Sequence, residues 1–193
     1  MYERGGEIVL EIVFWGVGLS GKTTNLQHVF AHTPPERRSA MESIADARGR
    51  LLSFSMRPES LAPLRGRPVR LALRTIPGAV VYDASRETIL RGADAVVHVV
   101  DTQAARLAQA IESARELAET SQRTTGRALG EVPLVRQYNK RDLPSALPRA
   151  ALDAAFGAPA RTVEAIATQG VGVLDTLREC ARLALEAEAA RTR

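Results

Sequence analysis

A glycine-rich segment constrains this chain more than any other feature of its sequence. It follows an apolar stretch, Glu7 to Trp15, and it precedes residues with helical apolar spacing, Leu26, Val29 and Phe30. The segment itself reads Gly16-Val17-Gly18-Leu19-Ser20-Gly21-Lys22-Thr23. A strand, a glycine-rich turn and a helix in this order are typical of a phosphate-binding loop, or P-loop, whose backbone N–H groups surround a phosphate at the start of the helix.

The residue types of this segment match that chemistry. Glycines allow the backbone to curl so that successive N–H groups point inward. Lys22 is expected to reach the β- and γ-phosphates, and the hydroxyl of Thr23 is expected to bind Mg²⁺. The residues expected to bind the nucleotide here are Gly16, Gly18, Leu19, Ser20, Gly21, Lys22, Thr23 and Thr24.

Apolar runs alternate with helical patterns along the rest of the chain. We expect further strands at Val69 to Thr75, Ala93 to Val100, Pro133 to Tyr138 and Arg161 to Ala167. We expect further helices at Ser85 to Leu90, Ala104 to Thr120, Arg149 to Phe156 and from about Val173 onward. The alternation predicts an α/β fold with a mostly parallel central sheet and helices on both faces, and together with the P-loop it indicates the three-layer P-loop NTPase fold. Between Arg37 and Pro68 we expect a mobile connection.

Length and composition favour one soluble globular domain spanning residues 1–193. The chain is 45% hydrophobic and 25% charged, which excludes general disorder. Its single cysteine, Cys180, excludes an internal disulfide and a cysteine-based zinc site and favours the cytoplasm. Neither an apolar run long enough to span a bilayer nor a lipid-anchor motif is visible. The net charge is +4, but the basic residues are scattered and aromatics make up only 4%, so we expect no nucleic-acid partner.

A second motif follows the strand predicted at Pro133 to Tyr138. It reads Asn139-Lys140-Arg141-Asp142, which is the guanine-reading pattern Asn-Lys-x-Asp. The carboxylate of Asp142 can accept hydrogen bonds from N1–H and the 2-amino group of guanine, neither of which adenine offers. Asn139 would connect this loop to the P-loop, and the stem of Lys140 would lie over the purine. Thr168 and Gln169 follow the last predicted strand and could offer backbone N–H groups to guanine O6.

With these motifs the sequence resembles the bacterial small Ras-like GTPases of the gliding-motility protein MglA type. The similarity covers most of the chain, and its distinctive element is Thr75-Ile76-Pro77-Gly78. The other segments that carry it are Phe14 to Gln27, Tyr82 to Arg86, Ile89 to Gly92 and Gln137 to Pro144.

The resemblance implies a regulatory switch that binds GTP or GDP with Mg²⁺. In this family Thr75 stands where ordinary Ras-like proteins carry an Asp that supports the Mg²⁺ shell, and Gly78 would offer its backbone N–H to the γ-phosphate. The segments 37–68 and 77–86 would differ between the two nucleotide states. The resemblance also implies a roadblock-fold regulator of the MglB type as partner, with effectors in cell polarity or motility.

The sequence departs from the family at positions that serve hydrolysis. Ala79 occupies the place of the Gln that orients the attacking water, and an alanine cannot hold water by a hydrogen bond. The family's Asp-Arg-Thr stretch is matched best by Gly49-Arg50-Leu51, so Arg50 is the candidate catalytic arginine, with Arg48 as an alternative, whereas Leu51 offers Mg²⁺ no oxygen. We therefore expect slow GTP hydrolysis, unless a partner supplies the missing groups. The alternatives are a non-hydrolysing pseudo-GTPase scaffold and, less well matched, a P-loop kinase.

Four other features invite a functional interpretation, but a structural one is favoured. Asp101 follows an apolar strand as an acidic metal ligand would, yet a role in the turn fits its position better. His28 and His32 are spaced for a metal but have no third ligand nearby in sequence. Cys180 lies among alanines and leucines of a predicted helix, which favours a buried inert thiol. Trp15 is expected to pack in the core rather than to contact a cofactor.

Overall fold

The computed structural model describes residues 1–46, 49–59, 61–76, 83–157 and 161–191. It contains an eight-stranded sheet in the order β3-β4-β5-β2-β6-β7-β8, and β1 pairs with β2 outside this path. The pairs of β2 with β5 and β6, of β6 with β7, and of β7 with β8 are parallel, whereas β1–β2, β3–β4 and β4–β5 are antiparallel. The predicted mostly parallel sheet is confirmed.

The elements have the following bounds. The strands are β1 Tyr2–Arg4, β2 Glu7–Trp15, β3 Glu42–Asp46, β4 Gly49–Met56, β5 Val69–Thr75, β6 Ala95–Asp101, β7 Leu134–Asn139 and β8 Arg161–Glu164. The α-helices are α1 Lys22–Ala31, α2 Asp83–Arg91, α3 Leu107–Thr125, α4 Arg149–Phe156 and α5 Val173–Arg191. Short 3₁₀ turns are η1 Pro35–Arg37, η2 Ala104–Arg106, η3 Leu129–Glu131 and η4 Ala167–Gln169.

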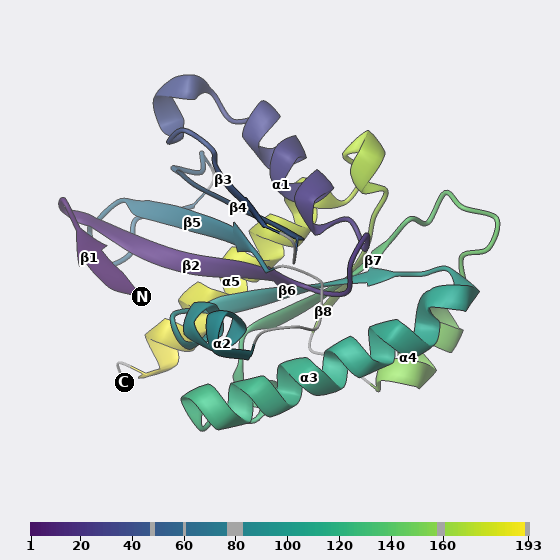
Figure 1. The fold of residues 1–193 in the computed structure, drawn as a ribbon. Helices are drawn as coiled ribbons and strands as arrows, with labels where there is room; N and C mark the ends of the chain where they lie inside the picture. Colours follow the sequence, from purple (N-terminus) through teal and green to yellow (C-terminus); the bar gives the residue numbers. More distant parts are fainter. Residues whose placement is uncertain (47–48, 60, 77–82, 158–160, 192–193) are drawn as a thin grey trace.

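The helices cover the sheet on both faces (Figure 1). Successive side chains of a strand point to opposite faces, so β2, which is apolar on both, contributes to two cores. Leu10, Ile12 and Phe14 pack with residues of α1 and α5. Val13 and Trp15 pack with residues of α2 and α3 on the other face. The three-layer arrangement therefore places the carboxyl end of β2, where the glycine-rich segment begins, between both helical layers.

The structure confirms most predicted elements and corrects several of their limits. The strands at Glu7 to Trp15 and Val69 to Thr75 and the helix at Arg149 to Phe156 have the predicted bounds. The last strand, however, ends at Glu164, because Ile166 leaves the extended conformation and η4 begins at Ala167. The long helix begins at Leu107 rather than Ala104, since η2 precedes it.

The prediction of a mobile connection between Arg37 and Pro68 is wrong. This segment contains β3 and β4, which pair with each other and, through β4, with β5. Leu52, Phe54 and Met56 are buried at every second position of β4, while the serines between them obscure the apolar pattern. The alternation Leu-Ser-Phe-Ser-Met was the signal for a strand with one buried face. The strand β1 was not predicted either, and its hairpin turn to β2 uses Gly5 and Gly6 at positive φ.

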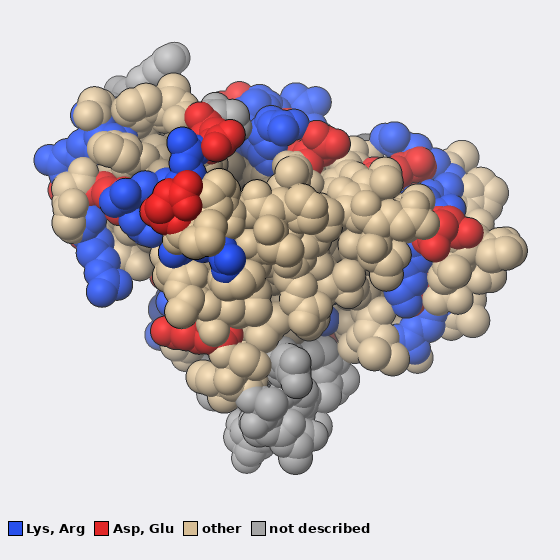
Figure 2. All heavy atoms as spheres, turned by 90° about the horizontal axis from the view of Figure 1, so that it is seen from above, with Lys and Arg blue, Asp and Glu red and all other residues tan. Residues whose placement is uncertain are grey.

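The surface carries charges of both signs. Figure 2 shows one face on which basic and acidic side chains alternate around a central area without charged groups. This distribution agrees with scattered arginines rather than a basic stripe. Among the described residues, no helix is long and apolar enough to cross a membrane.

Candidate nucleotide-binding site

The glycine-rich segment forms a tight loop between β2 and α1. Gly16 has φ 143°, and a Cβ at this position would lie 2.4 Å from the carbonyl oxygen of Val99 on the neighbouring strand β6. Gly21 has φ 109°, and a Cβ there would lie 2.1 Å from Nδ2 of Asn139. Both contacts are too short for any real side chain, so the loop can pass β6 and the Asn139 loop only with glycine at these positions.

Lys22 is the first residue of α1, and its side chain folds back over the loop. Its ammonium donates hydrogen bonds to the carbonyl oxygens of Gly16 and Val17, both at 2.7 Å, and the residue is buried. Burial, and secondarily the charge of Arg86, lower the pKa of Lys22 to about 8. A buried cation without an anionic partner is destabilised, and a phosphate would supply that partner.

The N-terminus of α1 lacks a side-chain cap. Its N-cap residue is Gly21, and no side chain there accepts from the first turn. The N-terminal N–H groups of a helix have no partners within the helix, and the helix dipole favours an anion at this end. Thr23 is half-buried in this turn, and Ser20 is completely buried with its hydroxyl unpaired within the described structure. Uncapped donors and the Lys22 ammonium together fit a phosphate group.

The second motif lies against this loop, at the carboxyl end of β7. Asn139 donates through Nδ2 to the Ser20 carbonyl at 2.8 Å, and its Oδ1 accepts from the Ala167 backbone N–H at 2.9 Å. The predicted connection between the two motifs is therefore confirmed, and it extends to η4. A Cβ on Gly170 would lie 2.0 Å from the ring of His28, so η4 packs directly on α1.

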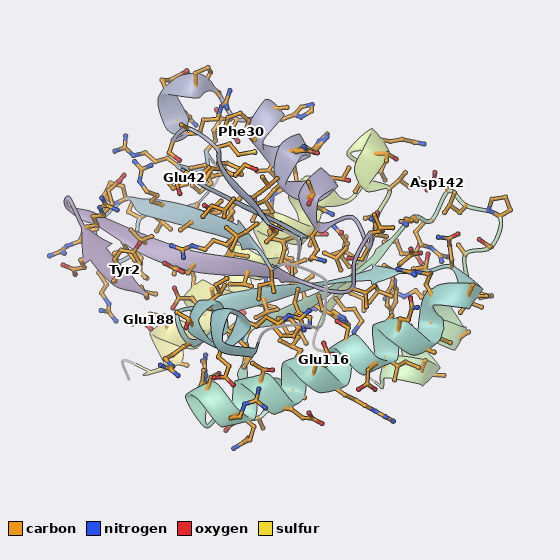
Figure 3. The ribbon with its side chains drawn as sticks, viewed as in Figure 1. Tyr2, Phe30, Glu42, Glu116, Asp142 and Glu188 are labelled. Carbon is orange, nitrogen blue, oxygen red and sulfur yellow. The ribbon has the colours of Figure 1, made fainter. Side chains whose placement is uncertain are left out.

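A cavity of about 160 Å³ lies where the three loops meet. It is lined by Leu19, Gly21, Thr24, Asn139, Lys140, Asp142, Leu143, Ala167 and Thr168. Asp142 is exposed on the loop after β7, as Figure 3 shows, and Leu19 is 87% exposed at the rim. Gln169 is exposed on η4 and does not belong to this lining. Residues from three separate sequence regions thus surround one cavity beside the P-loop.

A buried polar cluster between α1, β7 and α5 supports this arrangement and was not predicted from the sequence. Asn25 and Gln137 exchange hydrogen bonds of 2.8 and 2.9 Å through their side-chain amides. Asn25 also donates to the Gly21 carbonyl at 3.0 Å, and Gln137 donates to the Thr176 hydroxyl at 2.9 Å. All three side chains are completely buried, so α1, β7 and α5 are held in register beneath the P-loop. The signal was the presence of amide side chains at otherwise apolar positions.

The opposite side of the loop is formed by β4 and β5. Thr75 is completely buried, and its hydroxyl accepts a hydrogen bond of 2.8 Å from the Leu52 backbone N–H. Ser53 pairs with Arg74, so Arg50 lies farther toward the edge of the sheet at which β5 ends. That edge also carries the P-loop, because Phe14 on β2 pairs with Thr75. Gly78 and Ala79 lie outside the described residues.

The structure shows the surroundings of the four features for which a structural interpretation is favoured. Asp101 is 1% exposed, and its carboxylate accepts from Lys140 and Gln103. The rings of His28 and His32 stack at 3.9 Å, and no group of three metal-binding side chains occurs among the described residues. Cys180 is completely buried, which raises the pKa of its thiol. Trp15 donates to the Ser113 carbonyl at 2.9 Å inside the core.

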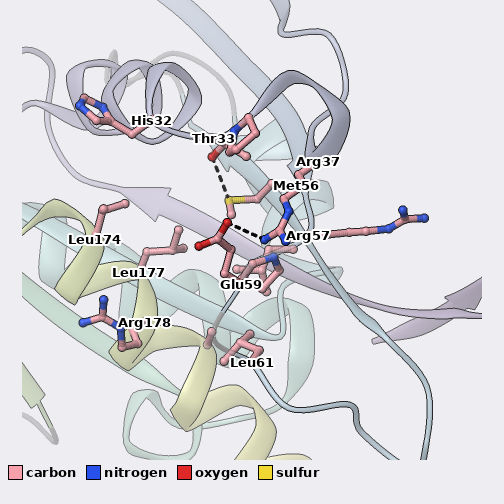
Figure 4. Close-up of a pocket in the computed structure, with 14 residues that line it drawn as sticks. His32, Thr33, Arg37, Met56, Arg57, Glu59, Leu61, Leu174, Leu177 and Arg178 are labelled. Atoms are coloured by element: carbon pink, nitrogen blue, oxygen red, sulfur yellow. Dashed lines mark hydrogen bonds and ion pairs between the residues drawn. The ribbon is translucent and has the colours of Figure 1, made fainter.

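Two other cavities border the P-loop or the end of α1. One of about 300 Å³ is bordered by Val17, Gly18, Arg86, Arg106 and α3. The other, of about 230 Å³, lies between the end of α1, the end of β4 and α5, with an apolar floor that includes Met56 and Leu177 (Figure 4). An ion pair between Arg37 and Glu59, with 2.8 Å between the two groups, crosses its border. This second cavity contains none of the candidate nucleotide-binding residues.

A known protein is similar to this chain over nearly its whole length. No protein-family model matches the chain. A curated protein, the mutual gliding-motility protein MglA of Myxococcus xanthus (strain DK1622), is 42% identical over 182 residues, which cover 93% of this chain and 92% of the relative. An identity of this size over nearly the whole length, combined with a P-loop and a guanine motif on a three-layer α/β fold, shows that the chain belongs to the MglA-type family of small Ras-like GTPases.

Proposed function

We propose that this protein is a guanine-nucleotide-binding switch that takes GTP or GDP together with Mg²⁺. The observation that carries the proposal is the hydrogen bond from Asn139 to the Ser20 carbonyl, which joins the guanine motif to the P-loop beside one cavity. The loop and the N-terminus of α1 would hold the phosphates, and Lys22 would neutralise their charge. Mg²⁺ would bind the Thr23 hydroxyl and, in the GTP state, the phosphates.

Base selection is assigned to Asp142. When guanine is bound, the carboxylate accepts from N1–H and the 2-amino group, while Lys140 lies along the purine ring. Because adenine offers no matching donors, it would leave the carboxylate unpaired. Binding of fluorescently labelled GDP, with unlabelled GDP and ADP as competitors, tests this assignment. Equal competition by the two nucleotides would contradict it.

We also propose that GTP hydrolysis is slow and that Arg50 is the candidate catalytic arginine. The support is chemical: Ala79 cannot orient water, and Leu51 cannot bind Mg²⁺. Arg50 lies near the start of β4, three residues before Ser53, which pairs with Arg74 near the end of β5. Loss of one group that acts in the transition state typically lowers a rate about 10²- to 10³-fold. Single-turnover hydrolysis of bound GTP, with Ala79→Gln and Arg50→Ala measured in parallel, separates a slow enzyme from a scaffold that only binds.

The role of the switch follows from the relative, which is named for gliding motility. We propose that this protein acts in cell polarity or motility, in the cytoplasm, with a roadblock-fold regulator of the MglB type as partner. A pull-down with GDP-loaded and GTP-loaded protein tests this partner. Preferential capture by the GTP-loaded form is the expected result, and equal capture contradicts a switch.

A further inference from the structure

Asp101 is a buried charge at the junction of the two nucleotide motifs. It is the last residue of β6, is 1% exposed, and pairs in parallel register with Asn139 on β7. Its Oδ2 accepts from the Lys140 ammonium at 2.7 Å. Its Oδ1 accepts from the Gln103 backbone N–H at 3.2 Å and from the Gln103 side-chain amide at 3.1 Å. The carboxylate thus fixes the position of a lysine that belongs to the guanine motif.

Arg106 extends this contact to the P-loop. Its Nε lies 3.8 Å from Oδ2 of Asp101, and its Nη2 donates to the Gly18 carbonyl at 2.9 Å. The planar guanidinium presents several N–H donors in a fixed arrangement, so one arginine can face a carboxylate and a carbonyl at once. Gly18, Arg106, Asp101 and Lys140 therefore form a continuous bridge between the P-loop and the guanine motif.

The contact with Gly18 also sets the direction of a backbone donor. In a trans peptide the C=O and the following N–H point in opposite directions. Because the Gly18 carbonyl is held toward Arg106, the Leu19 N–H points away from Arg106. Leu19 has φ 64°, a conformation that a non-glycine residue adopts only where neighbouring contacts hold it. The hydrogen bond from Arg106 fixes the Gly18–Leu19 peptide that precedes this residue.

The buried Asp101 carboxylate is kept ionised by the partners that surround it. Burial acts to raise the pKa of the Asp101 carboxyl, but the hydrogen bonds from Lys140 and Gln103 outweigh it, so this pKa lies below its ordinary value. The carboxylate is therefore ionised at neutral pH and faces two cations. Removal of one partner from such a group leaves a buried charge that is poorly compensated.

We propose that Asp101 and Arg106 are positioning residues that lock the P-loop and the guanine motif into one geometry for nucleotide binding. Arg106 would hold the Gly18–Leu19 peptide so that its N–H meets the phosphates, and Asp101 would hold Lys140 beside the base. This inference rests on the proposed nucleotide binding. Asp101 and Arg106 would then contribute to nucleotide affinity and not only to the structure of the turn after β6.

The test compares GDP and GMP binding by wild type, Asp101→Asn, Arg106→Ala and Arg106→Lys. Loss of a charge-assisted hydrogen bond corresponds to about a 10- to 100-fold loss of affinity. We expect Arg106→Ala to weaken GDP binding by that factor and GMP binding less, because the affected N–H serves the phosphate beyond the first. Arg106→Lys should recover only part of the loss, since an ammonium cannot replace both contacts. Asp101→Asn should weaken GDP and GMP to a similar degree.

A double-mutant cycle tests the bridge itself. If Lys140 and Arg106 act through the shared Asp101, the losses from Lys140→Ala and Arg106→Ala will combine to less than their product. The matched control is Asp175→Asn, which removes an exposed ion pair of 2.7 Å with Arg178 on α5 and should leave GDP affinity unchanged. Thermal unfolding of every variant identifies those that fail to fold. If Arg106→Ala is among them, Asp101→Asn, which conserves the shape of the side chain, tests the positioning role by itself.

The outcomes are distinct. An unchanged ratio of GDP to GMP affinity in folded Arg106→Ala, or fully multiplicative losses in the cycle, overturns the positioning role while GDP binding by the wild type stands. Failure of the wild type to bind GDP overturns the proposed function itself.

Discussion

The two sides of the candidate site are built differently. On the base side, Asn139 is hydrogen-bonded at both ends of its amide, to Ser20 and to Ala167, and the residues involved are interior parts of the fold. On the phosphate-sensing side, the described structure contributes the Thr75 hydroxyl, bound to the Leu52 N–H. The positions that would serve hydrolysis there carry Leu51 and Ala79. Ser20, Lys22 and Asn139, which we propose hold the nucleotide, are thus buried parts of the fold, whereas Leu51 lies near the start of β4 and Ala79 lies outside the described residues. Under this proposal, binding can persist where hydrolysis is impaired.

The largest effect is expected on the base side, from Asp142→Asn. The substitution replaces one acceptor oxygen with an N–H₂ donor, so the contact to the 2-amino group is lost and the contact to N1–H is no longer charge-assisted. Two charge-assisted hydrogen bonds correspond to a loss of GDP affinity of about 10²- to 10⁴-fold. Xanthosine diphosphate, whose base has a carbonyl at C2, should regain part of that loss. Competition binding measures both, and an unchanged preference for GDP would show that Asp142 does not read the base.

Asn139→Ala tests whether the base side also supports the fold. The substitution leaves the Ser20 carbonyl and the Ala167 N–H without their partner, both in buried surroundings. We expect the free energy of unfolding to fall by about 2 to 4 kcal/mol, measured by urea denaturation without nucleotide.

The matched control for Asn139→Ala is Gln122→Ala. Gln122 donates an exposed hydrogen bond of 3.3 Å to the Gly126 carbonyl at the end of α3. Its loss should change the free energy of unfolding by at most about 0.5 kcal/mol. Equal effects of the two substitutions would contradict a structural role for the base-side connection.

The pH dependence of stability tests the burial of Lys22, which lies between the two sides and which we propose binds phosphate. In the folded protein the pKa of Lys22 is about 8, against 10.5 for an ordinary lysine, so the unfolded chain binds more protons between these values. Folding stability must therefore rise with pH through this window, by about 1.4 kcal/mol per pH unit and about 3 kcal/mol in total. Below pH 8 the folded protein bears the full free-energy cost of burying the charged Lys22 ammonium.

Lys22→Met isolates this contribution from the other titrating groups. Without nucleotide, the stability of the wild type relative to the variant should increase from pH 8 to 10.5, as measured by denaturant unfolding at each pH. A difference between the two proteins that stays constant with pH would mean that Lys22 is not desolvated in the folded state.

The smallest effect is expected on the phosphate-sensing side, from Thr75→Val. The shape of the side chain is conserved, but the Leu52 N–H loses its acceptor. We expect a loss of about 1 to 2 kcal/mol of unfolding free energy. Thr124→Val serves as control, because it removes a hydroxyl that bonds within α3 to the Thr120 carbonyl and lies near solvent. A loss from Thr75→Val larger than that from Asn139→Ala would reverse the comparison.

The sequence predicted the fold where a buried element has a continuous apolar pattern or a clear helical period. The strand at Glu7 to Trp15 and the helix at Arg149 to Phe156 have the predicted limits for that reason. The prediction failed at β4, where one face is apolar and serines occupy the other, because the alternation is short and lies in a charged segment. Half-buried strands depend on their neighbours, and neighbours are set by tertiary structure.

The candidate site was predictable to the extent that its residues form contiguous motifs. The P-loop and the guanine motif are of this kind, and their junction through Asn139 followed from their known geometry. Arg106 and Gln137 are isolated in sequence and gain their partners only through the packing of β6, β7 and α1. The amide at an otherwise apolar position marks Gln137, but no local pattern marks Arg106 or identifies the partners of either residue, so only the three-dimensional structure reveals these contacts.

The uncapped start of α1 has a consequence for the lifetime of the protein. Part of the free energy that orders this helix end comes from whatever anion it holds, so a tightly bound nucleotide adds to the stability of the whole domain. At a free concentration 100 times its dissociation constant, a ligand contributes about 2.7 kcal/mol. The unfolded fraction that proteases can degrade then depends on the guanine nucleotide pool, and the abundance of this protein would follow the metabolic state of the cell.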